Sequence, residues 1–218
     1  MIENYKASLD LSAPLGQLSE VKVGSVARGA EAIILAGGLG TRLRSAVPDL
    51  PKCMAPVAGR PFLGHVIDSL RREGVQRFIF SLGYLHETIE AWLAEAYPTL
   101  DYTTVIEHEP LGTGGGILLA LRAAQTEQVL VANGDTLFEV NVPALVELQE
   151  RTGAECTLAL KPMTDFHRYG VVRTGSDGIV TAFEEKKHYA EGLINGGLYL
   201  VNKERLLALG LPEKCSFE

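Results

Sequence analysis

The stretch from Glu31 to Pro56 reads EAIILAGGLGTRLRSAVPDLPKCMAP, and the rest of the chain is interpreted from it. It opens with a short apolar run, residues 32–36, which is typical of a buried strand in a parallel sheet. Glycines follow at positions 37, 38 and 40. Because glycine lacks a Cβ, this loop can adopt positive φ and direct several N–H groups at one anion. Arg42 and Lys52 come next, and these donors together favour a polyphosphate ligand.

The glycine loop has three alternatives to a role in phosphate binding. A Rossmann fingerprint requires a third glycine where the chain has Leu43. A Walker A loop requires the string G-x-x-x-x-G-K-[ST], which does not occur. An ordinary turn after a strand would leave Arg42 and Lys52 merely solvated. The density of glycines and cations in one segment favours the phosphate site over that turn.

Composition limits the kind of protein and its partners. The 218 residues, 46% of them hydrophobic, suffice for one large α/β domain with a substantial core. A net charge of −7 argues against a nucleic-acid partner or an anionic membrane surface. Cys53, Cys156 and Cys215 show neither zinc nor disulfide spacing. No apolar run approaches the roughly 20 residues of a membrane span, so we expect a soluble cytoplasmic protein with no membrane partner.

The first half of the chain alternates strand and helix patterns. The strand patterns cover residues 32–36, 77–82, 101–106 and 128–131. The helix patterns cover residues 61–73 and 86–97, and a third helix follows a second glycine loop at 112–116 and runs to Gln125. Such alternation predicts an α/β fold with a doubly wound, mostly parallel sheet. Ligands of such sheets bind at the carboxyl ends of strands, where both glycine loops fall.

The second half of the chain has a different pattern. A helix at 143–152 precedes strand patterns, which cover residues 156–161, 170–173, 178–183 and 193–201. No linker separates the two halves, so we predict a β-rich lobe that continues the first sheet. Residues 1–29 are predicted to be an N-terminal extension, either disordered or with one or two short strands. The domain itself is then expected to span residues 30–218.

The chain resembles the sugar-phosphate nucleotidyltransferases, which join a nucleoside triphosphate to a sugar 1-phosphate and release pyrophosphate. Four strings carry the resemblance: LAGGLGTRL (35–43), PKCMAP (51–56), EPLGTGG (109–115) and LPEKCSFE (211–218). The last two are most similar to the branch that uses GTP and D-glycero-D-manno-heptose 1-phosphate. The resemblance implies the family's Rossmann-like nucleotidyltransferase fold, with the β-rich second half as a sugar-binding lobe. It also implies nucleotide sugar synthesis for a surface glycan such as lipopolysaccharide or capsule.

The resemblance assigns roles to individual residues. Arg42 and Lys52 would be catalytic, because they would neutralise charge on the phosphates. The nucleotide would contact the two glycine segments, at Leu35, Ala36, Gly37, Gly38, Gly40, Thr41, Gly112 and Thr113. The sugar 1-phosphate would contact Gly134, Glu185, Lys186 and Asn195. Asp135 would bind Mg²⁺, the implied cofactor, because it follows a strand and carboxylate oxygens suit that ion.

Several of these residues could also have an ordinary structural role. The string from Asn133 to Asp135 is a common Asx turn. Thr113 is a suitable helix cap. The run 184–187, which we expect at the end of a strand that reaches Lys186, is typical of a solvated charge cluster. The resemblance favours the functional assignment in each case. Cys53 adjoins Lys52, which would lower the pKa of its thiol, but we do not expect it to be catalytic.

The implied mechanism is an in-line attack of the sugar 1-phosphate oxygen on the α-phosphorus of the nucleotide. The glycine loop and Arg42 would hold the β- and γ-phosphates, Lys52 would stabilise charge at the α-phosphate, and Lys186 would align the incoming phosphate. The sequence departs from the family in two places. Cys53 stands where proline is usual, and a second metal-binding aspartate in a D-I-G-like segment is absent. We therefore expect either a truncated chain or another group that completes the site.

Two further classes of function compete with this enzyme. A non-catalytic protein that binds nucleotides or sugar phosphates would use the same residues. A nicotinamide-dependent oxidoreductase is weakened by the failed glycine spacing. Within the enzyme class, three other substrate pairs remain open: mannose 1-phosphate with GTP, glucose 1-phosphate with dTTP, and N-acetylmuramate 1-phosphate with UTP. Families of this kind often dimerise through the second lobe, so a homodimer is one expected assembly.

Overall fold

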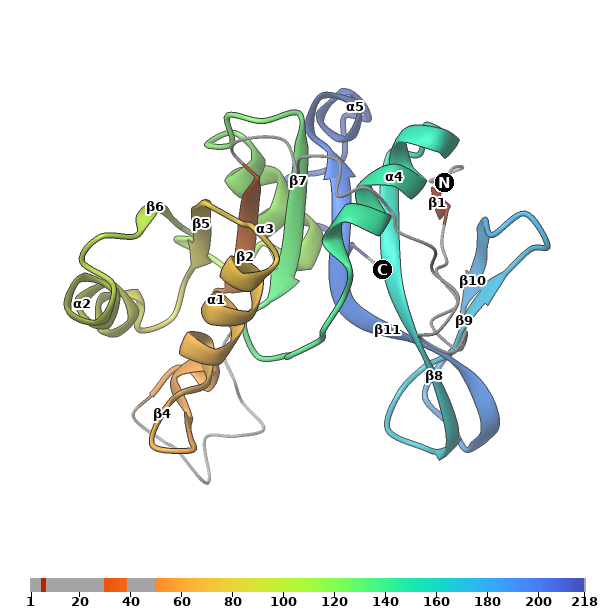
Figure 1. Ribbon diagram of the computed structural model, residues 1–218, viewed down its shortest axis with the longest axis horizontal. Coiled ribbons are helices and arrows are strands. Elements are labelled where there is room, and N and C mark those ends of the chain that lie inside the picture. Colours follow the sequence, from red (N-terminus) through yellow and green to blue (C-terminus); the bar gives the residue numbers. More distant parts are fainter. Residues whose placement is uncertain (1–4, 7–29, 39–49, 218) are drawn as a thin grey trace.

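The computed structural model describes residues 5–6, 30–38 and 50–217 (Figure 1). Its strands are β1 (Tyr5–Lys6), β2 (Glu31–Ala36), β3 (Pro56–Val57), β4 (Arg60–Pro61), β5 (Arg77–Leu82), β6 (Asp101–Ile106), β7 (Gln128–Asn133), β8 (Cys156–Phe166), β9 (Val172–Thr174), β10 (Val180–Phe183) and β11 (Tyr189–Asn202). Its helices are η1 (Lys52–Met54, a 3₁₀ helix), α1 (Phe62–Arg72), α2 (His86–Ala96), α3 (Gly112–Leu121), α4 (Val142–Thr152) and α5 (Lys203–Ala208). Seven strands form one sheet in the order β1-β8-β11-β7-β2-β5-β6.

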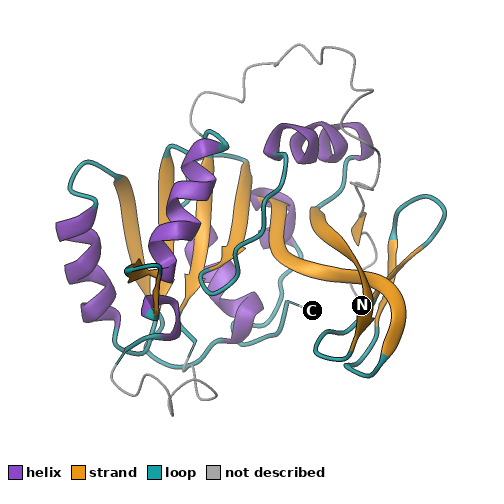
Figure 2. Cartoon of the chain, turned by 60° about the horizontal axis from the view of Figure 1, so that its bottom comes forward, coloured by secondary structure: helices purple, strands orange, loops and turns teal. Residues whose placement is uncertain are grey.

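Four parallel strands form one half of this sheet. β2 pairs with both β5 and β7, and β5 pairs with β6. Numbered along the chain, these strands stand in the spatial order third, second, first, fourth, which is the order of a doubly wound Rossmann-type sheet. Helices lie on both faces of this half (Figure 2). The predicted α/β fold with a doubly wound, mostly parallel sheet is confirmed.

The core consists of one apolar layer on each face of the sheet. Helices α1, α2 and α4 pack against one face, and α3 and α5 pack against the other. Neighbouring residues of β2 serve both layers, since Ile34 belongs to the first and Ile33 to the second. Because both faces of β2 are covered, the strand is apolar almost throughout instead of alternating with polar residues.

The other half of the sheet is built on β8 and β11, the longest strands, with 11 and 14 residues. They pair antiparallel and extend beyond the sheet, where β9 and β10 lie beside them (Figure 1). The register shifts between Asn195 and Tyr199. A small separate cluster of buried side chains supports the projecting part: Phe166, Val171, Tyr189 and Ile194. The β-rich continuation of the sheet is therefore confirmed, while sugar binding by this lobe remains a prediction.

Two local predictions were wrong. Residues 112–116 are not a loop, because α3 begins at Gly112, and the helix ends at Leu121 instead of Gln125. β10 ends at Phe183, so the run 184–187 lies in the loop before β11 and not on a strand. Helix α5 and the small hairpin of β3 and β4 were not predicted.

Within the predicted N-terminal extension, the two residues of β1 pair parallel with β8. The other residues of the extension lie outside the described ranges. Across those ranges, no helix combines the length and the apolar character needed to cross a membrane.

A buried carboxylate holds the end of the sheet opposite to the carboxyl ends of the parallel strands. Glu31, which is 1% exposed, forms an ion pair with Arg77. It also accepts hydrogen bonds from the backbone N–H groups of Gln125 and Thr126, both at 2.6 Å, and from the Thr126 hydroxyl at 2.9 Å. Burial alone would raise the pKa of Glu31, but these hydrogen bonds outweigh it and hold the pKa below its ordinary value of 4.5.

We expect Glu31→Gln to lower the free energy of unfolding at pH 7 by about 2 kcal/mol, because the amide cannot accept all of these hydrogen bonds. A carboxyl with a lowered folded-state pKa stabilises the fold above its unfolded pKa, and this contribution is lost as the pH falls through the folded pKa. The difference between the wild type and Glu31→Gln should therefore shrink below about pH 4.5. Urea unfolding at pH 7 and at pH 3 to 4 measures it, and a difference that stays constant would contradict this role.

Candidate functional site

The carboxyl ends of β2 and β7 meet at the point where the strand order reverses, and ligands of doubly wound sheets bind at such a point. Leu35 pairs with Asn133, and the N–H of Gly134 donates to the carbonyl oxygen of Leu35 at 2.9 Å. A Cβ on Gly134 would lie 3.0 Å from that oxygen and 3.4 Å from the Cβ of Ala36. The absence of a side chain at Gly134 thus lets the ends of β2 and β7 pack closely. Four of the predicted site residues lie together here: Leu35, Ala36, Gly134 and Asp135.

Lys52 and Asp135 form an ion pair at this place, although they are 83 positions apart. Lys52 begins η1, and Asp135 lies two residues after β7. The two side chains are 45% and 34% exposed, so a ligand can reach both. The structure therefore brings the predicted catalytic cation and the predicted metal ligand into direct contact.

Cys53 points away from this pair and into the core, where it is 3% exposed. Burial raises the pKa of its thiol to about 12, and the nearby Asp135 carboxylate adds to the shift. The expected influence of Lys52 on this thiol is therefore outweighed. Cys53 stays a neutral thiol near pH 7, which agrees with the expectation that it is not catalytic.

Gly37 follows β2 and faces a carboxylate that the sequence patterns did not identify. A Cβ on Gly37 would lie 2.6 Å from Oε1 of Glu107. Glu107 comes directly after β6 and accepts hydrogen bonds from the Ser81 hydroxyl at 2.9 Å and the Leu111 N–H at 3.3 Å. The signal for it was a carboxylate at the end of a parallel strand, a position that Asp135 shares, although Asp135 was assigned through the family resemblance. Gly38, the next predicted residue, is exposed with open space around it.

The first turn of α3 is occupied by the chain's own C-terminal segment, residues 213–217. The carbonyl oxygen of Cys215 accepts hydrogen bonds from the N–H groups of Gly114 at 3.0 Å and Gly115 at 3.3 Å. Gly112 has a φ of +77°, and a Cβ there would lie 2.5 Å from the same oxygen. Amide groups at a helix start that would otherwise bind an anion are therefore satisfied within the protein.

Thr113 is likewise engaged by this segment. Its hydroxyl accepts a hydrogen bond from the N–H of Phe217 at 2.9 Å, and α3 has no side-chain cap. The Phe217 ring packs edge-on against Tyr199 of β11, with ring centroids 5.1 Å apart. The structural alternative for Thr113, a helix cap, is therefore not observed, because the hydroxyl binds the C-terminal segment instead. Gly112 and Thr113 are exposed, and their contact with a nucleotide remains a prediction.

The predicted sugar-side residues fall into two groups. The Asn195 amide stabilises the irregular part of β11, since it donates to the Tyr199 hydroxyl at 2.8 Å and accepts from the Gly197 N–H at 2.8 Å. Glu185 and Lys186 are exposed in the loop between β10 and β11. Asn195 thus has a structural role besides any contact with sugar, and the sugar contacts of all three residues remain predictions.

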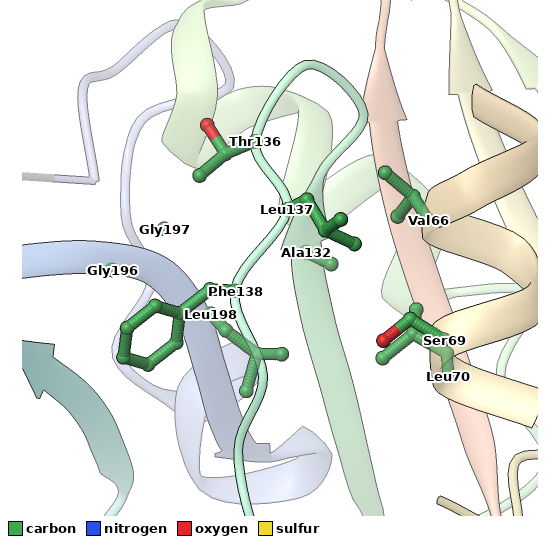
Figure 3. A pocket seen from close by; sticks show the side chains of 10 residues that line it. All are labelled: Val66, Ser69, Leu70, Ala132, Thr136, Leu137, Phe138, Gly196, Gly197 and Leu198. Atoms are coloured by element: carbon green, nitrogen blue, oxygen red, sulfur yellow. The ribbon is translucent and has the colours of Figure 1, made fainter. Parts of the chain in front are cut away.

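A small hollow lies beside the loop that follows β7 (Figure 3). Its lining comes from α1, from the loop at 136–138 and from the start of the bulge in β11 at 196–198. Its volume is about 10 Å³, roughly the space of one water molecule. It is therefore too small to hold a nucleotide or a sugar, and it is not the substrate site.

Mg²⁺ is implied by the family resemblance, and Asp135 is the residue present to bind it. Within the described ranges, no three His, Cys, Asp or Glu residues cluster as a metal centre. Mg²⁺ is often held by one or two carboxylates together with substrate phosphates and water. One accessible carboxylate at the switch point fits that mode of binding and does not fit a site made of protein ligands alone. Gly40, Thr41 and Arg42 of the prediction lie outside the described residues.

Comparison with known proteins gives consistent results at the levels of family, sequence and structure. The profile of the family described as Nucleotidyl transferase matches residues 31–214. The D-glycero-alpha-D-manno-heptose 1-phosphate guanylyltransferase of Aneurinibacillus thermoaerophilus is 48% identical over 188 residues, which are 86% of this chain and 81% of the relative. The protein of the same name from Campylobacter jejuni is 42% identical, over 86% of this chain and 83% of its own length.

Among solved structures, HddC from Yersinia pseudotuberculosis complexed with GMP-PN is similar, with a TM-score of 0.78 and 35% identity. The match covers 87% of this chain and 83% of that one. The inositol-1-phosphate CTP transferase of T. maritima matches with a TM-score of 0.68 but only 19% identity, over 87% of this chain and 78% of that one, so that likeness concerns the fold alone.

Proposed function

Because the chain belongs to the nucleotidyl transferase family, we propose that it transfers GMP from GTP to D-glycero-D-manno-heptose 1-phosphate and releases pyrophosphate. The product is the corresponding GDP-heptose. Two proteins that bear the name of this activity are more than 40% identical to most of the chain, and this similarity carries the proposal. The accessible Lys52–Asp135 pair at the switch point supports it from the structure.

The chemistry asks the protein mainly to position two phosphates and to neutralise their charge. The attacking oxygen of the sugar 1-phosphate is already ionised, so no general base is required. Lys52 neutralises charge that develops at the α-phosphate, while Arg42 holds the β- and γ-phosphates. Lys186 holds the incoming phosphate, and Glu185 accepts hydrogen bonds from sugar hydroxyls. Gly134 allows the sugar ring to lie close to the strand ends.

Asp135 is the proposed ligand of Mg²⁺. When bound, the ion neutralises phosphate charge and polarises the phosphoryl oxygens. Asp135 would hold the ion through a carboxylate oxygen, and the exposed ammonium of Lys52 beside it would be available to the phosphates. We further propose a cytoplasmic location, supported by three free cysteines, two of which are buried, and a product used for lipopolysaccharide or capsule.

The proposal is tested by a pyrophosphate-release assay with GTP, heptose 1-phosphate and Mg²⁺. Release should require all three, and excess EDTA should stop it. The controls replace GTP by ATP, CTP, UTP or dTTP, and the heptose by mannose 1-phosphate or glucose 1-phosphate. Nucleotide binding without release under any combination would favour a non-catalytic binding protein. Faster release with another pair would change the substrate assignment but not the reaction class.

A further inference from the structure

Glu184, in the loop between β10 and β11, is bound on both carboxylate oxygens. Arg173 of β9 donates from Nε to Oε1 at 2.7 Å and from one terminal nitrogen to Oε2 at 3.2 Å. The hydroxyl of Tyr189 also donates to Oε2, at 2.9 Å. This bidentate arrangement fixes direction as well as distance. Glu184 is therefore fixed by partners outside the run Glu-Glu-Lys-Lys, although it is still 30% exposed and lies 4.0 Å from Lys187 of that run.

Tyr189 joins this contact to a rigid support. It is 7% exposed, and its ring stacks on Phe166 with centroids 5.6 Å apart, inside the small apolar cluster of the projecting lobe. Its hydroxyl lies 2.9 Å from the carbonyl oxygen of Glu185 as well. The backbone of the loop is also held, because the N–H of Glu184 donates to the carbonyl oxygen of Val171 at 2.7 Å. The loop is thus fixed through side chain and backbone to three strands.

The next two side chains are left exposed by this arrangement. No hydrogen bond or ion pair among the described residues engages the side chain of Glu185 or Lys186. Arg173 pairs with Glu184, and Lys187 lies 4.0 Å from the same carboxylate. Arg173 thus brings a third cation to a run that contains two carboxylates and two lysines, and the group has a surplus of one positive charge. A group with one surplus positive charge suits a phosphate, whereas the two glutamates and two lysines of the run alone would have no net charge.

We propose that Arg173, Glu184 and Tyr189 are positioning residues that hold Glu185 and Lys186 in place for the sugar 1-phosphate. This inference rests on the proposed function and adds residues that do not themselves touch the substrate. The Arg173 contact, followed by that of Tyr189, holds the pKa of Glu184 at about 2, so the Glu184 contact stays ionised throughout any practical assay range. Arg173 is 52% exposed, so its loss should disturb the geometry of the loop more than the stability of the fold.

The test is Tyr189→Phe, which removes one hydroxyl and keeps the ring stacked on Phe166, together with Arg173→Gln. Each should raise KM for heptose 1-phosphate about 10-fold, because a small displacement of a binding group costs affinity. KM for GTP should stay within about 2-fold, and Tm within about 2 °C. Arg173→Lys keeps the positive charge but cannot donate two parallel hydrogen bonds as the guanidinium does. Its KM for heptose 1-phosphate should therefore lie between those of the wild type and Arg173→Gln.

A matched control is Asp165→Asn. Asp165 pairs with His188 at 2.9 Å on the same projecting lobe, with both side chains exposed and no contact to Glu184. This variant should leave both KM values unchanged. The inference is overturned if Tyr189→Phe and Arg173→Gln keep the wild-type KM for the sugar 1-phosphate. It is also overturned if they raise both KM values equally or lower Tm substantially, since either result indicates a merely structural role.

The proposed function can fail separately. In that case, the wild type releases no pyrophosphate with heptose 1-phosphate. Calorimetric affinities for mannose 1-phosphate and glucose 1-phosphate then replace KM as the measurement. Weaker binding by Tyr189→Phe and Arg173→Gln than by the wild type and Asp165→Asn supports the positioning role. Equal binding by all four proteins, or none by any of them, overturns it.

Discussion

Replacing Lys52 by methionine is expected to lower kcat for pyrophosphate release by about 10²–10³-fold, the usual cost of removing one preorganised electrostatic stabiliser. Lys52 is the cation that contacts Asp135 where β2 and β7 end. Methionine keeps an unbranched, flexible side chain that is one atom shorter, and it removes the charge. The effect should fall mainly on kcat, because charge at the α-phosphate is greatest in the transition state.

The fold should tolerate this change. Both members of the Lys52–Asp135 pair are substantially exposed, and exposed pairs contribute little to stability, so Tm should hardly move. Arg151→Met is the matched control, since it removes a cation from the exposed side of α4 and should leave kcat unchanged. Wild-type turnover by Lys52→Met would remove this residue from the mechanism. An equal loss in Arg151→Met would show that overall charge matters and not position.

Gly115→Ala is expected to destabilise the protein by about 3 kcal/mol, although alanine is the better helix former by about 1 kcal/mol. The added Cβ would meet the carbonyl oxygen of Glu213, which belongs to the backbone, and would lie 2.7 Å from the Cβ of Leu111. The C-terminal segment then has to leave the first turn of α3. Phe217, which is 6% exposed, would lose its packing, and the hydrogen bonds to Cys215 and Thr113 would be lost with it.

Thermal unfolding measures this effect, and Tm should fall by about 6–12 °C for a domain of this size. Gly38→Ala serves as the stability control, because a Cβ there would meet nothing within 4 Å and its φ is not positive. That control should keep the wild-type Tm whatever it does to nucleotide binding. A Gly115→Ala protein as stable as Gly38→Ala would mean that the C-terminal segment adapts without cost.

Sequence patterns predicted those parts of the fold that depend on local rules. The bounds of β5 follow from a short apolar run and those of β6 from an alternating pattern, each with turn residues on either side. The placement of Asp135 near the glycine loop followed from the rule that the carboxyl ends of parallel strands meet. Its pairing with Lys52 joins positions 83 apart, but both lie in motifs that were already assigned to one site.

The parts that failed depend on partners distant in the sequence. The glycines at 112–116 were interpreted as a loop because nothing near them shows that residues 213–217 pack on that turn. Glu184 was grouped with the charged residues around it because its partner Arg173 belongs to another strand. A helix that accepts glycine and a carboxylate that is fixed by an arginine on another segment both depend on tertiary contacts, which no local pattern contains.

The position of β11 has a consequence for how the protein is made. This strand lies between β7 and β8, so the sheet is not continuous until residues near 202 have left the ribosome. Until then, the nascent chain exposes the edge of β7 that faces away from β2, because only β11 pairs with that edge. Unpaired edges of this kind recruit other chains. Slow translation or premature termination shortly before β11 should therefore favour aggregation more than interruption after α5, when β11 already covers that edge.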